Sequence, residues 1–354
     1  MAILSRFSRR ASCLFRVCVL GVRTMSELKS PNRILTCSGD FTPQQVVACM
    51  LLKLHPSFVN TEVIRSSELD DIQEGDAQVE IGEVHDPENF LFGGSCGSSL
   101  SFSSFNAGNG PRLPLSIAGV VYSNHGKEIL RNLLGSKAED CIYTLFKKVY
   151  ESFIIEIDAL ALGYPIGFSP MKYRISTDLT TRINRLNITA RRNCEDGAEA
   201  FAKALSIAEL EFREQIDYYM HVWAPARELV KRAIQTRKSL YQSGEIIQLS
   251  TGGCPWVEHL FDIEKDLNIE DAIKFVLFED SRCSNWRVQS VPVTPKSFVL
   301  RVGLKDEWRG SRDEELSRVA GIPGCIFAHS SGFIGGNATF DGALQMAIKS
   351  LPVS

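Results

Sequence analysis

The chain has 354 residues, of which 44% are hydrophobic and 23% charged, and its formal net charge is -3 at pH 7. That composition is typical of a globular protein long enough for two packed domains. It excludes a chain that binds nucleic acid through overall positive charge, so any such site must be a local basic patch.

The first 26 residues form a separate segment by composition. Residues 1–25 contain five arginines, three serines and no acidic residue, which is typical of a mitochondrial presequence and also of a disordered basic tail. We expect a mitochondrial protein without membrane contact, because the longest apolar run, at 17–22, is too short to span a bilayer. Met25 offers a second start, and a protein beginning there would stay in the cytosol or nucleus.

Residues 33–82 predict strands that alternate with a helix. Residues 34–36 form a short apolar run. The helix that follows is expected from Pro43 to Leu54, because Thr42 suits the N-cap, proline suits the first turn, and Gln45 completes a capping box. Two further strands are expected at 61–65 and 78–81. This alternation predicts an α/β fold with a parallel sheet.

The rest of the chain reads as a loop, helices and a second α/β region. A Gly/Ser-rich loop is expected between 93 and 109. Helical stretches follow at 119–122, 128–134 and 139–157, and again at 196–240, where Pro225 interrupts the pattern. The tail predicts strands at 274–280, 286–293, 297–303 and 325–329, a helix at 312–319, a glycine turn and a closing helix at 341–351.

Four long motifs stand out in the second half of the chain: WAPARELV at 223–230, GGCPWVEHL at 252–260, EWRGSRDEEL at 307–316 and GIPGCIFAHSSGFIGG at 321–336. They are similar to signatures of the Myg exonuclease family. VEIGEVHDP and SIAGVVYSNHG align as well, and the resemblance covers about residues 33 to 351.

The resemblance implies an α/β protein of the DHH phosphoesterase type, with two α/β domains that flank a cleft. Their expected limits are 30–190 for the metal-site domain, 191–245 for a helical connector and 246–354 for the substrate-binding domain. Such enzymes hold two divalent ions between acidic and histidine side chains and hydrolyse RNA from 3′ to 5′.

The family's first motif is changed at nearly every ligand place. A pattern of the type His-Asn-Gly-x-Phe-His-x-Asp-Glu reads CSGDFTPQQ at 37–45. The two histidine places carry Cys37 and Thr42, and the Asp-Glu pair has become Gln44 and Gln45. Asp40 is a new carboxylate, but it lies out of register.

The later ligand places are changed too. Glu80 replaces the next family aspartate and is the one candidate metal ligand in register. His125 lies one residue beyond a family histidine place, and on a helix that displacement turns the side chain by ~100°. Asp158 survives near the last place. The other places carry residues without a carboxylate or imidazole: Gly93, Gly94, Ser95, Asn124 and Ala161.

A lone carboxylate cannot hold two divalent ions. We therefore expect no catalytic residue and no cofactor, with Mn²⁺ or Mg²⁺ as the ions if the family activity survives. None of the ten cysteines forms a Cys-x-x-Cys pair, which argues against a structural zinc site. His55, His221 and His259 show no metal-ligand spacing and are expected to be structural.

Phosphate-binding residues are implied in the C-terminal segment. By the resemblance, arginines, a histidine and a glycine-rich turn would bind substrate phosphate. These residues are Arg309, Arg312, His329, Gly335 and Gly336. The family histidine after the glycines is Asn337 here. Alternatively, the two arginines pair with the acidic residues at 313–315, as surface residues commonly do.

A second basic stretch lies in the middle of the chain. Arg182 and Arg185 belong to it, together with Lys172, Arg174, Arg191 and Arg192, and Asp178 is its only acid. It would form a local path for RNA. A solvated helix face explains the same residues equally well.

We therefore expect a catalytically impaired relative of an RNA exonuclease, with a binding or regulatory role in RNA metabolism. One alternative is an active metal-dependent 3′-5′ RNA exonuclease. Another is a scaffold that binds protein partners and no nucleic acid. Nothing in the sequence identifies such a partner.

Overall fold

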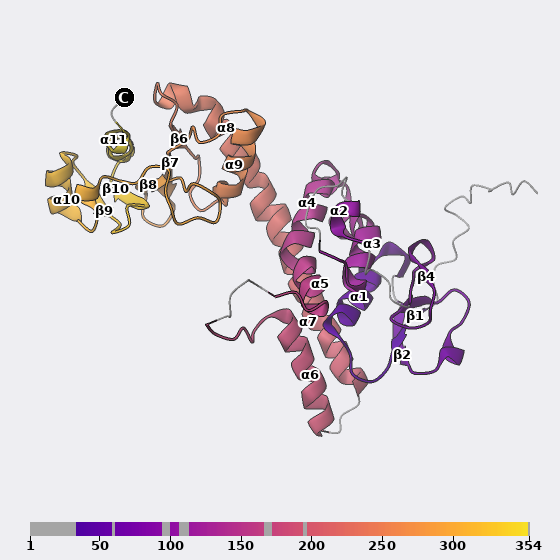
Figure 1. Cartoon of the computed structure of the whole chain (residues 1–354). Helices are drawn as coiled ribbons and strands as arrows, with labels where there is room; N and C mark the ends of the chain where they lie inside the picture. The colour runs from indigo at the N-terminus through magenta and orange to yellow at the C-terminus, as the bar shows by residue number, and fades with distance from the viewer. Residues whose placement is uncertain are drawn as a thin grey trace, which may run out of the picture.

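The structure is a computed structural model, and it describes residues 33–58, 61–93, 100–105, 113–165, 172–193 and 197–352. The predicted presequence at 1–26, the second start and the ligand places Gly94 and Ser95 lie outside the described residues. Two five-stranded sheets occupy opposite ends of the described chain, with long helices between them (Figure 1). Within these residues, no helix combines the length and the apolar character that crossing a membrane requires.

The first sheet is parallel in its main part, as the sequence predicts. Its strand order is β2-β1-β3-β5-β4, and only the edge strand β4 runs antiparallel to its neighbour. The strands are β1 (Arg33–Cys37), β2 (Glu62–Ser66), β3 (Ala77–Val79), β4 (His85–Asp86) and β5 (Leu91–Phe92). The carboxyl ends of β1, β3 and β5 therefore meet at one edge of the sheet.

Helix α1 (Pro43–Leu54) follows β1, and its start confirms the predicted capping box. The backbone N–H of Gln45 donates to Thr42 Oγ1 over 3.2 Å, and the N–H of Thr42 donates to Gln45 Oε1 over 3.2 Å. Nearly all of α1 is buried because α3 (Ile117–Leu134) and α7 (Gly197–Tyr218) pack against it. The other helices of this part are α2 (Phe102–Phe105), α4 (Ile142–Val149), α5 (Ile155–Ala161) and α6 (Leu179–Asn193).

One long helix connects the two sheets. It consists of α7, a π-helical turn at Tyr219–Trp223 and α8 (Ala224–Leu240). The interruption predicted at Pro225 corresponds to this π-helical turn. Proline lacks an N–H, and in a regular α-helix its ring would clash with the preceding turn, so the wider turn accommodates it. Buried residues of α7 belong to the core of the first sheet, whereas those of α8 pack against the second.

The second sheet has the order β6-β7-β8-β10-β9, with β6 parallel to β7 and the other pairs antiparallel. Its elements are β6 (Ile246–Gln248), α9 (Trp256–Asp266), β7 (Phe275–Asp280), β8 (Asn285–Ser290), α10 (Asp313–Ala320), β9 (Cys325–Ala328), β10 (Ile334–Asn337) and α11 (Phe340–Ser350). Both faces are covered, since Phe275 and Leu277 of β7 face one apolar cluster and Val276 faces another.

Two predictions for this region are wrong. Residues 297–303 do not form a strand, and their only ladder contact is an isolated bridge between Pro292 and Leu300. The expected glycine turn ends before Gly335 and Gly336, because both residues lie inside β10 between β8 and β9.

Candidate functional site

The edge where β1 and β3 end carries the positions that correspond to the family's first ligand motif. Gln45 is buried there, and its Nε2 donates to Thr36 Oγ1 over 2.8 Å and to the carbonyl oxygen of Cys37 over 3.0 Å. The Cys37 Sγ lies 3.1 Å from the same nitrogen. An amide nitrogen has two hydrogens and offers no lone pair to a cation. Gln45 therefore acts here as an internal donor.

Glu80, the predicted metal ligand, follows β3 at this edge with a left-handed φ of 55°. Thr42 Oγ1 lies 3.5 Å from its Oε2. Burial raises the pKa of the Glu80 carboxyl, against the lowering effect of hydrogen bonds from Thr42 and Gln44. Burial and the nearby Glu80 also raise the pKa of the Cys37 thiol. Burial thus makes ionisation of both groups less favourable than in water.

Asp158 is completely buried and caps helix α3. Its Oδ1 accepts hydrogen bonds from the Ser116 N–H at 3.0 Å, the Ser116 hydroxyl at 2.7 Å and the Gly119 N–H at 3.1 Å. Its Oδ2 accepts from the Tyr150 hydroxyl at 2.8 Å. Burial raises the pKa of Asp158 to about 6, although these bonds lower it. A Cβ on Gly119 would lie 2.3 Å from Oδ2, so this close approach requires glycine.

The predicted phosphate-binding residues gather beside β9 and β10. Arg309 donates through Nε to the Leu304 carbonyl at 3.0 Å and pairs with Asp306 at 2.7 Å. The backbone of Arg312 forms a bridge to Phe327, and both Arg312 and His329 are exposed. Gly335 and Gly336 are buried in β10, where an added Cβ would meet neighbouring side chains at 2.8 and 2.9 Å. Their role in this structure is close packing within the sheet.

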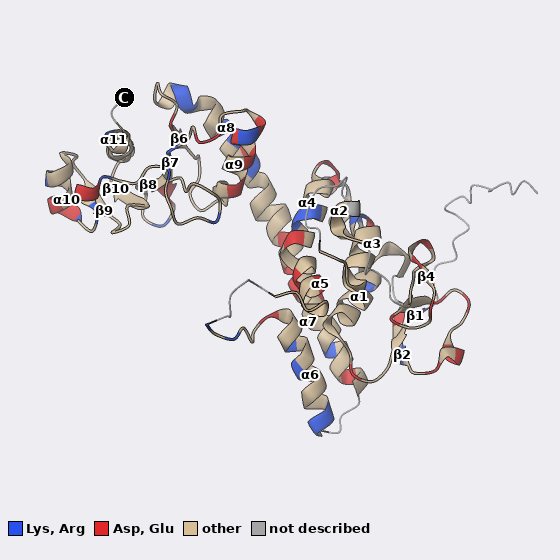
Figure 2. Ribbon diagram, in the orientation of Figure 1, with Lys and Arg blue, Asp and Glu red and all other residues tan. Residues whose placement is uncertain are grey.

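The predicted basic stretch is distant from that group, on and near α6 (Figure 2). Arg182 lies 3.7 Å from Glu211, and Arg185 donates to the Ser176 carbonyl at 2.7 Å. Arg191 lies 3.4 Å from Asp40, the out-of-register carboxylate. Helix α6 itself contains no acidic residue. The structure therefore places an exposed basic face on α6, with its acidic partners on neighbouring elements.

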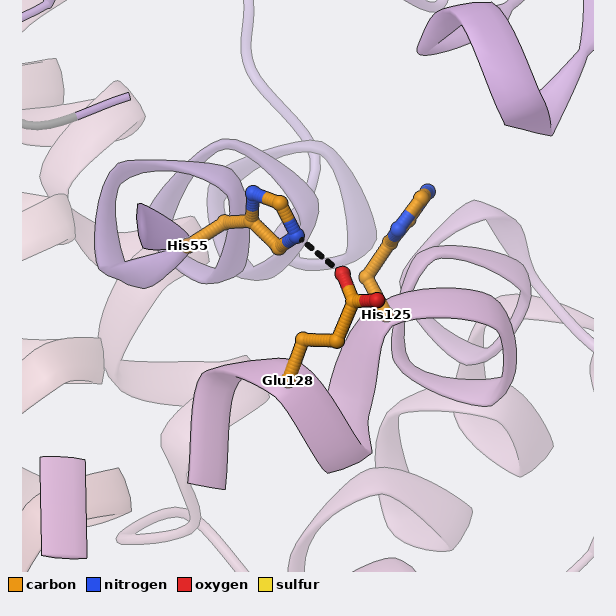
Figure 3. Close-up of side chains that lie close together, drawn as sticks. All are labelled: His55, His125 and Glu128. Atoms are coloured by element: carbon orange, nitrogen blue, oxygen red, sulfur yellow. Dashed lines mark hydrogen bonds and ion pairs between the residues drawn. The ribbon is translucent and has the colours of Figure 1, made fainter. Parts of the chain in front are cut away.

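A cluster that sequence spacing does not reveal lies at the other end of α1 (Figure 3). His55 directly follows α1, and His125 and Glu128 belong to α3. Each offers one ligand atom, and these atoms lie within 4.8 Å of one another. Within the described ranges, this is the one set of three such side chains close enough to hold an ion. The pattern His-x-x-Glu in α3 was its only sequence signal, since residues three apart share a helix face.

Hydrogen bonds determine which nitrogens of the two imidazoles carry a proton. His55 Nε2 lies 2.6 Å from Glu128 Oε2, and the Ser57 N–H donates to His55 Nδ1 over 3.2 Å. His55 Nε2 is therefore the donor to the carboxylate. His125 Nε2 lies 3.0 Å from the Pro87 carbonyl oxygen, which can only accept. Burial, and then the neighbouring His55, lower the pKa of His125 to about 4, so its neutral ring keeps a lone pair on Nδ1.

His259 and His221, which were expected to be structural like His55, lie outside this cluster. His259 is buried and donates to the Trp223 carbonyl at 2.8 Å, and its ring packs against that indole. His221 is exposed and lies 3.6 Å from Asp217 on the same long helix.

Known proteins resemble this chain over nearly its whole length. A family model for MYG1 exonucleases, described as "Uncharacterised protein family (UPF0160)", matches residues 33–351. The MYG1 exonucleases of Mus musculus and Homo sapiens are each 39% identical over 332 residues, which cover 93% of this chain and 87% and 88% of theirs. The MYG1 protein of Dictyostelium discoideum is 38% identical over 324 residues, covering 90% of this chain and 96% of its own. No solved structure matches the chain. The chain therefore belongs to the MYG1 exonuclease family.

Proposed function

We propose that this chain is a non-hydrolytic member of the MYG1 exonuclease family, with a DHH phosphoesterase-like arrangement of two α/β domains and a binding role in RNA metabolism. The observation that carries the proposal is the amide of Gln45, which occupies a family carboxylate place and donates to Thr36 and Cys37. Two-metal hydrolysis of a phosphodiester requires several anionic or imidazole ligands that converge on one point. At position 45 the group that points inward is the amide nitrogen of Gln45, which donates hydrogen bonds and cannot act as a ligand.

The acids that remain at or near the family's ligand places in the sequence have other partners. Asp158 accepts four hydrogen bonds as the cap of α3, and Asp40 lies beside Arg191. Glu80 is left with Thr42 and Gln44 as its neighbours. One carboxylate cannot offset the repulsion between two divalent ions a few ångströms apart. The ligand set thus supports a protein that no longer hydrolyses RNA.

The test is hydrolysis of a 3′-labelled and a 5′-labelled RNA by the full chain, with Mn²⁺ or Mg²⁺ and with a chelator. The MYG1 exonuclease of Mus musculus serves as the positive control under the same conditions. We expect the same background cleavage with and without chelator. Turnover in Mn²⁺ or Mg²⁺ that a chelator abolishes would establish the alternative, an active metal-dependent exonuclease, and end this proposal.

We propose further that the exposed face of α6 binds the RNA backbone. Arg185 and Arg192 are exposed on that face. Residues 179–193 of the helix include no acidic residue, and the one nearby carboxylate of the stretch, Asp178, precedes the helix. Binding to single-stranded RNA through such contacts weakens with salt, by a slope of about 0.7 in log K per phosphate neutralised. Arg312 and His329 are proposed as additional phosphate contacts at the second sheet.

Fluorescence anisotropy with a labelled RNA at several salt concentrations tests this contact. The double substitution Arg185→Gln/Arg192→Gln should weaken binding and reduce the salt slope by ~1 to 1.5. Lys231→Gln/Arg232→Gln on α8 removes the same charge from another exposed helix and is the matched control. Equal weakening in both variants, or no RNA binding by the wild type, contradicts the proposal, and the second result favours a protein-binding scaffold.

Import into mitochondria is proposed from residues 1–26, and a cytosolic or nuclear form from a start at Met25. The support is the arginine-rich composition of residues 1–25, which lack any acid. A fusion of residues 1–26 to a fluorescent protein should localise to mitochondria, and the full chain with Met25→Ala should lose any cytosolic form. A diffuse fusion would refute the first statement, and an unchanged distribution of the variant the second.

A further inference from the structure

The cluster of His55, His125 and Glu128 is built differently from an ordinary surface ion pair. The side chain of His55 is only 4% exposed, and His125 is 9% exposed, whereas the Glu128 side chain is 50% exposed. The carboxylate of Glu128 lies between the two imidazoles in Figure 3. Two fixed nitrogen donors and one adjustable oxygen donor thus face a common point at the protein surface.

The surroundings of the cluster fix the two rings. Phe90 stacks on His125 with ring centroids 4.7 Å apart and meets His55 at 5.2 Å. Phe58 and Phe92 pack edge-on against His55 and His125, respectively. The Pro87 carbonyl accepts a hydrogen bond from His125 Nε2, which is the outer-sphere contact that typically orients a metal-binding histidine. The lone pair of Nδ1 is then directed away from that carbonyl, as ligation requires.

We propose that His55, His125 and Glu128 form a binding site for one divalent cation of the zinc class. Two imidazole nitrogens and one carboxylate oxygen are a donor set that suits Zn²⁺, with a further position left for water. Mg²⁺ and Ca²⁺ prefer oxygen donors and are disfavoured here. The site stands apart from the family edge, since His55 and Thr42 flank α1 at opposite ends, about 18 Å apart for a helix of 12 residues.

Small movements complete this site. Donors on a tetrahedral ion with bonds of about 2.0–2.2 Å lie roughly 3.3–3.6 Å apart, whereas the ligand atoms here lie within 4.8 Å. The half-exposed side chain of Glu128 is free to make that adjustment by changing rotamer. The ion takes the place of the proton on His55 Nε2 that now bonds to Glu128, and that proton moves to Nδ1, so the ring stays neutral and only its tautomer changes.

The contact between Ser57 and His55 gives the proposal an additional consequence. With an ion on Nε2, the neutral ring of His55 carries its proton on Nδ1, which then cannot accept the Ser57 N–H. Ion binding must therefore turn that N–H away, in the short helical turn Pro56–Phe58. Adventitious binding at a surface carboxylate would leave this amide unchanged.

The experiment is a Zn²⁺ titration of the metal-stripped full chain against a competing chelator, with Co²⁺ as a spectroscopic probe. We expect one Zn²⁺ per chain at this site, visible Co²⁺ absorption without a sulfur-to-cobalt band, and a shifted Ser57 amide resonance. Glu128→Gln keeps a hydrogen-bond acceptor for His55, and His125→Phe keeps an aromatic ring against Phe90. Each should weaken Zn²⁺ binding by more than the roughly 10–100-fold that loss of an outer-sphere partner costs.

Glu62→Gln is the matched control, because it removes one exposed carboxylate on β2 and should leave the affinity unchanged. Three results would overturn the proposal. They are a wild-type chain that binds no Zn²⁺, an affinity that both substitutions leave unchanged, and Co²⁺ bound through cysteine sulfur alone. The readouts are binding and spectra, so they remain informative whether or not the chain hydrolyses RNA.

Discussion

Replacing Gln45 by glutamate tests the central physical claim, that this position has become an internal hydrogen-bond donor. Glutamate restores the family's residue type with almost no change of shape. It removes the bonds from Nε2 to Thr36 Oγ1 and to the Cys37 carbonyl, and turns a carboxylate oxygen toward that carbonyl. Thr36 cannot compensate, because its hydroxyl already donates to the Val79 carbonyl at 2.8 Å. The new side chain must therefore be protonated or repelled.

The expected loss of stability is mainly the free energy needed to keep the new carboxyl group protonated. A glutamate titrates near pH 4.3 in water, so holding it neutral at pH 7 costs about 4 kcal/mol at 1.36 kcal/mol per pH unit. The lost amide hydrogen bond adds about 1 kcal/mol. The folded-state pKa of this glutamate would lie above its unfolded value, so the free energy of unfolding falls as pH rises from about 4 to 7. We expect Gln45→Glu to cost about 5 kcal/mol at pH 7 and about 1 kcal/mol at pH 4.

Hydrogen exchange of peptides from β1 and α1, supported by circular dichroism in urea, measures this effect. Tryptophan fluorescence is unsuitable, because Trp223, Trp256, Trp286 and Trp308 all lie outside the first sheet. Gln235→Glu on an exposed turn of α8 is the matched control and should be neutral within about 0.5 kcal/mol. A Gln45→Glu protein as stable as the wild type at pH 7, or equally destabilised at both pH values, would refute the reasoning.

Two further substitutions test buried polar groups by thermal unfolding. Asp158→Ala leaves the N–H groups of Ser116 and Gly119 without their acceptor and should cost about 3–5 kcal/mol, whereas Asp158→Asn keeps an acceptor and should cost about 1 kcal/mol. Equal losses would show that the cap is unimportant. Arg301→Met leaves Glu264 buried without its partner at 2.7 Å and should cost about 3–5 kcal/mol, most of which the added change Glu264→Gln restores. An undiminished loss in the double variant would contradict this.

The sequence predicted correctly those elements whose conformation depends on residues close together in the chain. The start of α1 was predictable to the residue because Thr42, Pro43 and Gln45 act within one helical turn. The parallel character of the first sheet followed from strands that alternate with a helix. Neither inference needed a contact between distant parts of the chain.

The wrong predictions concern segments whose conformation depends on contacts with residues far away in the sequence. Residues 297–303 have the apolar pattern of a strand, yet the guanidinium of Arg301 is fixed by Glu264 of α9. The backbone hydrogen bonds of this segment go to Val291, Val293 and Thr294 and do not extend into a ladder. Gly335 and Gly336 look like a turn, but they lie in β10. Leu304 and Met346 occupy the space that a side chain at 335 would need, and Arg287 and Phe327 occupy it at 336. The site around His55 was unpredictable for the same reason, because only the packing of α1 against α3 joins its members.

The two ends of α1 together suggest why the family site would not return through single substitutions. At the start of α1, Gln45 already donates hydrogen bonds to Thr36 and to the Cys37 carbonyl. A single carboxylate restored at this position would be repelled by the Cys37 carbonyl oxygen, because no cation is yet present to stabilise it. A bound ion would offset that cost only after several ligands had returned together, because affinity depends on the full set. His55 and Glu128 are already in contact, and His125 lies beside them, so at that end an ion needs only a change of the His55 tautomer and one change of rotamer. Acquiring a cation is therefore physically easier at the end of α1 than at its start.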